Sequence, residues 1–210
     1  MSYATQNTAD STDRRASRAV RAAFAVTAGA ALALAGAGAA AAGTGLVPAT
    51  AAVCTAAQLL GNPGFETGAA APWSTSPAVV NPMGGGQVSH SGNWYAGMNG
   101  YGTTHTDTLQ QTVAVPLTCT NKTFSFWLHI DTAETTTTTA FDKLQVQVVS
   151  TPGTSTLATF SNLNHTAGYV KYTYNLAAYA GKTITVRFVG TEDASNQTSF
   201  VIDDTAVVNN

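Results

Sequence analysis

The sequence predicts an all-β protein, an antiparallel β-sandwich of the jelly-roll type that follows an export segment. Two observations lead to this fold class. After residue 51, short apolar stretches alternate with polar residues at period two, and turns rich in Gly, Pro and Asn separate them. The same part of the chain contains no convincing amphipathic helix. Eight or so short strands joined by turns are typical of a sandwich, so we expect one binding module over residues 52–210.

The stretch 123–131 gives the strongest strand signal in the chain. Its apolar residues lie at alternate positions and share one face: Phe124, Phe126, Leu128 and Ile130. The opposite face carries Ser125, Trp127, His129 and Asp131. Burial of the four apolar side chains contributes roughly 6–12 kcal/mol before conformational entropy is subtracted. We therefore expect one buried face and one face that offers an aromatic ring, an imidazole and a carboxylate.

The other strands follow from the same alternation and from the turns between them. The apolar residues 78–80 are followed by a loop rich in Pro and Gly, and the turn Ser91-Gly92 precedes a strand over 93–98. Pro116 ends a strand over 106–115, and the turn at 151–153 separates strands over 143–150 and 156–160. The last strands are expected over 170–176, 183–189 and 199–208.

Residues 1–51 are predicted to be a secretory signal peptide. Four arginines precede the uncharged run 22–42, and the small residues Ala49-Thr50-Ala51 follow it. The protein is therefore expected to be secreted. The pair Arg14-Arg15 leaves the twin-arginine and the general export routes both open. The alternative is an uncleaved leader that holds the chain at a membrane; a lipid anchor at Cys54 is disfavoured by the large Val53 before it.

Charge excludes one class of partner. After residue 51 the chain has five Lys and Arg residues against nine Asp and Glu residues, a formal net charge of −4. Nucleic-acid binding needs a basic stripe that follows the phosphates, and this acidic part of the chain has no such stripe.

The two cysteines, Cys54 and Cys119, both lie in the exported part. Two cysteines in an oxidising compartment predict one disulfide, which would tie the start of the module to the turn before the strand over 123–131. A metal site built on two isolated cysteines is disfavoured.

Motifs near both ends of the module resemble those of a known family. The segments 62–68 (NPGFETG) and 200–204 (FVIDD) resemble the bookends of bacterial carbohydrate-binding modules, which belong to the galactose-binding-like jelly rolls. The segments 100–109 and 127–134 resemble, more narrowly, a domain attached to secreted bacterial serine peptidases. The resemblance covers essentially all of residues 57–208. It implies a jelly-roll fold and a binding role, although no peptidase precedes the domain here.

The resemblance also implies a structural calcium ion where the two bookends meet. The implied ligands are the Gly64 carbonyl, the Glu66 carboxylate and Asp203 or Asp204, with Gln87 and the His90 carbonyl as the candidates from a middle segment. Calcium takes six to eight oxygen ligands, which carboxylates and carbonyls supply. The alternative is that Glu66 caps local amides and an aspartate closes a turn.

The predicted ligand-binding surface is the polar face of the strand over 123–131. Trp127, His129 and Asp131 project from it, and Arg187 points away from the apolar residues of its own strand. Trp94 and Tyr101 are expected to add an aromatic rim, as could Trp73 and Tyr95. Flat rings and planar polar groups suit the faces and hydroxyls of sugars. Core packing is the alternative for each tryptophan.

Two chemical alternatives are weaker. If the strands over 106–115 and 123–131 form a hairpin around Thr118, the pairs His105/Asp107 and His129/Asp131 converge as a metal site, but the faces match only with a β-bulge. Otherwise these are two ordinary surface histidines. Catalysis is not expected, because no nucleophile motif is present and Glu134 with Asp131 or Asp142 borders a run of threonines.

The expected function is thus a secreted, non-catalytic module that binds carbohydrate through a polar and aromatic sheet face. The alternative is a protein-interaction or accessory domain for a secreted peptidase.

Overall fold

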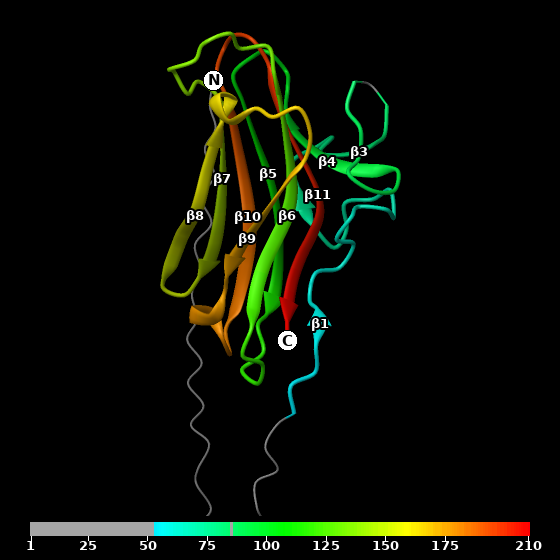
Figure 1. Cartoon of the computed structure of the whole chain (residues 1–210), viewed down its shortest axis with the longest axis vertical. Helices are drawn as coiled ribbons and strands as arrows, with labels where there is room; N and C mark the ends of the chain where they lie inside the picture. The colour runs from blue at the N-terminus through cyan, green and yellow to red at the C-terminus, as the bar shows by residue number, and fades with distance from the viewer. Residues whose placement is uncertain (1–52, 85) are drawn as a thin grey trace, which may run out of the picture. The chain divides into compact units, whose positions relative to one another are not determined.

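The computed structural model describes residues 53–84 and 86–210, which form two antiparallel β-sheets packed face to face (Figure 1). The predicted antiparallel β-sandwich is confirmed. The signal peptide expected over residues 1–51 lies outside the described residues. In the part of the chain that is described, no helix is long and apolar enough to span a bilayer.

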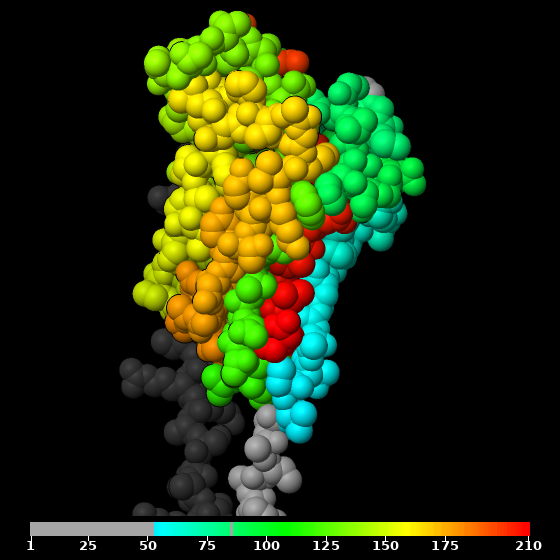
Figure 2. Space-filling view, in the orientation of Figure 1, coloured from blue at the N-terminus to red at the C-terminus, as the bar shows by residue number. Residues whose placement is uncertain are grey.

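Six strands form the larger sheet. They are β1 (Ala57–Gln58), β3 (Val80–Pro82), β4 (Trp94–Asn99), β6 (Lys122–Thr132), β9 (Val170–Asn175) and β11 (Thr198–Asn209). Their order is β3-β4-β11-β6-β9, and β1 pairs with β11. The C-terminal strand therefore lies at the centre of this sheet, as the red strand in Figure 1 shows. Its red atoms can be seen on the molecular surface in Figure 2.

Five strands form the smaller sheet. They are β2 (Ser74–Thr75), β5 (His105–Ala114), β7 (Lys143–Ser150), β8 (Gly153–Ser161) and β10 (Thr183–Glu192). Their order is β2-β5-β10-β7-β8. Two short 3-10 helices, η1 (Asn162–Asn164) and η2 (Ala177–Tyr179), lie in the connections.

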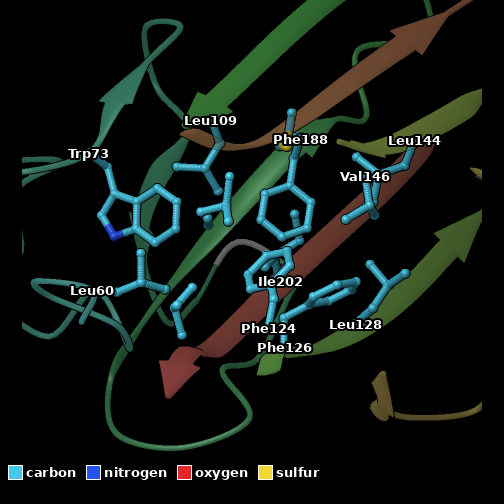
Figure 3. Close-up of a cluster of buried hydrophobic side chains, with 14 of the residues drawn as sticks. Leu60, Trp73, Leu109, Phe124, Phe126, Leu128, Leu144, Val146, Phe188 and Ile202 are labelled. Carbon is cyan, nitrogen blue, oxygen red and sulfur yellow. The ribbon is translucent and has the colours of Figure 1, made fainter. Parts of the chain in front are cut away.

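The core lies between the sheets and is built by the predicted alternation. Phe124, Phe126, Leu128 and Ile130 of β6 are at most 2% exposed, which confirms their inward face. Phe126 and Phe188 of β10 meet edge to face, with ring centroids 4.9 Å apart. Figure 3 shows these rings between Leu109 and Trp73 on one side and Leu144 and Val146 on the other.

The hairpin around Thr118, which the disfavoured metal-site alternative requires, is not formed. β5 pairs with β2 and β10, whereas β6 pairs with β11 and β9 in the other sheet. The chain crosses from one sheet to the other between these strands, so His105 and Asp107 cannot face His129 and Asp131 across a ladder. The four-residue metal site, which the sequence offered only as a weaker alternative, is therefore not formed.

The two ends of the module meet, as the bookend motifs imply. Thr205 donates to the Pro63 carbonyl through both its backbone N–H (2.9 Å) and its hydroxyl (2.8 Å). The disulfide predicted between Cys54 and Cys119 is present. It ties the start of the module to the segment that leads into β6.

Candidate functional site

The outer face of the six-stranded sheet holds most of the predicted ligand-binding residues. Trp127, His129 and Asp131 point outward from β6, because the alternate residues of this strand fill the core. Two cross-strand rows run over β6, β11 and β4: Asp131–Ser199–Asn99 and His129–Val201–Gly97. This face is therefore a short grid of one carboxylate, one imidazole, amide and hydroxyl groups, and small residues.

The segment between β3 and β4 covers one side of this face. The His90 ring stacks on the Trp127 ring with centroids 3.9 Å apart, and Tyr169 meets His90 edge-on at 5.3 Å. The Tyr169 hydroxyl donates to the Val88 carbonyl at 2.7 Å. Trp127 is consequently half-buried beneath its own chain and offers no open platform.

An open groove lies beside this covered area. A cleft of about 270 Å³ runs over β4 and β11, and one of about 420 Å³ adjoins it and shares Asn81 and Tyr95. The first is lined by Ala78, Asn81, Gln87, Tyr95, Gly97, Asn99, Tyr101, Ser199 and Val201. Gln87 also donates from its amide to Asp131 at 2.8 Å, which places that carboxylate at the border of the groove. Neither cleft is lined by Lys or Arg.

The loop after β4 holds the most exposed aromatic ring of the groove, Tyr101, which is 46% exposed. Its backbone N–H donates to the buried carboxylate of Glu192 at 3.0 Å, and the N–H of Gly102 donates to the same group at 2.8 Å. Burial, followed by the nearby charge of Asp107, raises the pKa of the Tyr101 hydroxyl. The buried Glu192 carboxylate thus anchors the loop after β4, and the Tyr101 ring remains at the surface.

The glycine at position 97 shapes the floor of the groove. A Cβ atom added at Gly97 would lie only 3.0 Å from the Tyr95 ring. Because Gly97 has no side chain, the Tyr95 ring can lie close along the strand. Tyr95, Gly97 and Asn99 alternate with the inward residues of β4. Asn99 and Ser199 were not among the predicted ligand-binding residues, although the alternation that identified the other strands also places them on this outer face.

Two tryptophans offered as rim residues serve packing instead. Trp73 is 4% exposed and its indole N–H donates to the Asn62 carbonyl at 3.1 Å. Trp94 points to the inner side of β4, where its ring lies against Gly68. The expectation of an aromatic rim at these two positions is therefore wrong, and core packing explains both.

Arg187 does not share a surface with Trp127. It projects from β10 on the outer face of the five-stranded sheet, where its Nε–H donates to Gln147 at 2.9 Å. The two outer faces of a sandwich point in opposite directions. The alternation of apolar and polar residues predicts which way each side chain points relative to its own strand. It does not predict which sheet the strand joins.

The implied calcium ligands come together only in part. Built on Gly64, a Cβ atom would lie 3.3 Å from an Asp204 oxygen and 3.8 Å from both an Asp203 oxygen and the Glu66 Cγ. A register shift after Asp203 and a φ of +42° at Asp204 turn these consecutive carboxylates toward the same corner. Gln87 is directed to Asp131 instead.

Hydrogen bonds already engage these carboxylates. Asp203 accepts from the N–H groups of His90 (2.8 Å) and Ser91 (3.1 Å), and the Asp204 carboxylate lies 2.6 Å from His90 Nδ1. Glu66 accepts from the N–H groups of Asn93 and Trp94 at 2.9–3.0 Å. Across residues 53–84 and 86–210, no three His, Cys, Asp or Glu side chains are arranged as metal ligands.

Negative charge is concentrated at this corner. Asp203 is fully buried, and no Lys or Arg of the described chain forms an ion pair with it. Burial raises the pKa of Asp203 to about 6, and the neighbouring Asp204 charge adds to this, while the N–H groups of Ser91, Asp204 and His90 oppose it. Carboxylate oxygens are ligands that calcium prefers, and in this structure those of Asp203 accept hydrogen bonds from His90 and Ser91.

Comparison with known proteins supports the fold. No protein-family model and no curated protein matches the sequence. Among solved structures, the chain is similar to the carbohydrate-binding module TmCBM61, solved in complex with β-1,4-galactotriose: the TM-score is 0.55 and the identity 18% over 73% of this chain and 99% of that one. Two more distant structures are also similar. One is a CBM22 xylan-binding domain of Xyn10C from Paenibacillus barcinonensis, with a TM-score of 0.43 and 14% identity over 74% of this chain and 96% of that one. The other is the cellulose-specific CBM28, with a TM-score of 0.45 and 9% identity over 72% of this chain and 95% of that one. The likeness to TmCBM61 shows the fold of this chain.

Proposed function

We propose that the described domain is a secreted, non-catalytic jelly-roll module that binds carbohydrate, and that the glycan lies in the groove over β4 and β11. The observation that carries this proposal is the lining of the groove: tyrosine rings together with side-chain amides and a hydroxyl. Sugars present C–H faces that pack on rings and hydroxyls that exchange hydrogen bonds with planar amides. The resemblance of the bookend motifs and the kind of structural neighbour found agree with this function.

The second candidate is an accessory domain that docks a secreted peptidase. It is favoured by the resemblance of segments 100–109 and 127–134, and by Met83 and Val88, which are 48% and 60% exposed beside the groove. Apolar side chains of this kind suit a protein partner as well as a sugar ring. Co-purification with an exported peptidase, without affinity for any glycan, would favour this candidate.

The groove is tested with Tyr101→Ala. Because this ring is the exposed aromatic surface of the groove, its removal is expected to weaken binding to a soluble β-1,4-galactan by about tenfold or more. Affinity electrophoresis and titration calorimetry with the full chain measure this change. The control is Leu117→Ala, which also removes an exposed apolar side chain (74% exposed) but lies outside the groove. Equal affinity of the two variants would show that the groove is not the binding site.

We further propose that calcium stabilises the corner formed by the Gly64 carbonyl, Glu66, Asp203 and Asp204. Bound calcium would neutralise the carboxylates, and a ligand at 100 times its Kd adds about 2.7 kcal/mol to the free energy of unfolding. For a domain of this size the Tm is then expected to rise by about 5–10 °C. Thermal unfolding with calcium, with magnesium as the control ion, and with a chelator measures the effect. The same Tm in all three solutions would remove calcium from this corner.

A further inference from the structure

The outer face of the five-stranded sheet is chemically unlike the rest of the domain. Four cross-strand rows run over β5, β10, β7 and β8, from the row of Thr106 to the row of Thr112. These 16 outward positions hold eight threonines and three glutamines, and they include Arg187 and Lys143 but no Asp, Glu or aromatic residue. The acidic residues of the domain therefore lie elsewhere, and this face carries a local positive charge.

The centre of the face is a continuous polar row. Gln110, Arg187, Gln147 and Thr156 lie opposite one another in register. The Arg187 Nε–H donates to Gln147 Oε1 at 2.9 Å, and the Gln147 amide donates to Gln145 at 2.9 Å. Gln147 is 8% exposed, so the Arg187 guanidinium is hydrogen-bonded to a side chain that is itself nearly buried in the sheet surface. This contact uses one of the five N–H donors of Arg187 and orients the plane of the group.

We propose that this face is a second binding surface, separate from the groove, and that it takes an acidic polysaccharide. An oriented guanidinium forms two parallel hydrogen bonds with a carboxylate, which gives geometric selectivity that an ammonium lacks. The threonine hydroxyls and glutamine amides around it match the hydroxyls of the sugar chain. A neutral glycan would gain nothing from the cations, and no ring is present on this face for its C–H surface.

Charge also favours a polysaccharide over a nucleic acid. Arg187 and Lys143 are the only cations on the face, and they lie in rows that are two apart. Nucleic-acid binding relies on neutralising many closely spaced phosphates, which two separated cations cannot do. A uronic-acid polymer with one carboxylate per sugar needs only occasional pairing with Arg187.

The test compares three polymers, of which DNA is the nucleic-acid comparison, and three variants of the full chain. Polygalacturonate is the acidic probe and β-1,4-galactan the neutral one. Arg187→Gln is expected to weaken polygalacturonate binding by about fivefold or more at low ionic strength, and to leave galactan binding unchanged. Tyr101→Ala is expected to do the reverse. Lys171→Gln is the matched control, because it removes an exposed cation from β9 in the other sheet.

Each outcome decides between the sites. Absence of polygalacturonate binding, or an equal loss in Arg187→Gln and Lys171→Gln, overturns the acidic surface. DNA that binds as tightly as polygalacturonate also overturns it, since the face would then be a general polyanion surface. If the wild-type chain binds polygalacturonate but not galactan, the groove is contradicted and this surface stays in place. The two proposals therefore fail independently.

Discussion

Replacing Phe126 with alanine is expected to lower the free energy of unfolding by about 3–5 kcal/mol. Phe126 is fully buried at the centre of the sandwich. Its ring lies 4.9–6.5 Å from five other aromatic rings, those of Phe124, Phe160, Tyr172, Tyr174 and Phe188. The substitution removes these contacts and leaves a cavity that the two hydrogen-bonded sheets cannot close by moving. A loss of this size is a large part of the stability of an ordinary domain.

Urea unfolding followed by tryptophan fluorescence measures the effect, with Phe141→Ala as the control. Phe141 is 43% exposed and precedes β7, so its loss is expected to cost less than about 1 kcal/mol. If both variants unfold at the same urea concentration, the ring cluster around Phe126 is not the centre of the core.

The strands and their buried faces could be predicted because alternation is a local signal. In β6 the identity of four consecutive inward residues determines which side is buried, whatever the partner strands are. The strand over 143–150 was predicted with the bounds that β7 has. The pairing of strands is not local, so the sequence left open whether β5 and β6 form a hairpin. A connection of seven residues can reverse within one sheet or cross to the other.

For the candidate site, the sequence predicted how single side chains point but not which of them share a surface, because that depends on the pairing of strands. Trp127 and Arg187 were each correctly expected to point away from their own apolar neighbours, yet they lie on opposite outer faces. The His90 ring over Trp127 depends on a loop whose path no periodicity describes. The resemblance of the bookend motifs correctly implied that Gly64 and Glu66 lie near Asp203 and Asp204, and Thr205 holds the two segments together by donating to the Pro63 carbonyl.

Removal of the disulfide should have the second large effect. The pair Cys54→Ser and Cys119→Ser opens a covalent loop with a sequence separation of 65 residues, for which the chain-entropy relation gives about 4 kcal/mol. A loss of this size lowers the Tm by about 8–16 °C in a domain of this length. The start of the module has few other attachments: β1 is two residues long, and Asn209 donates to the Thr55 carbonyl at 2.9 Å.

An effect of the disulfide on the unfolded chain can be distinguished from a loss of contacts in the folded domain. If the bridge acts on the unfolded chain, its removal makes that chain less compact, so the slope of unfolding free energy against urea should increase while the midpoint falls. Replacing Asn209 with alanine is the comparison, since it removes a native contact of the same segment and should leave the slope unchanged. A double-serine variant with the midpoint of the wild type would mean that pairing of β1 with β11 holds the segment without the bridge.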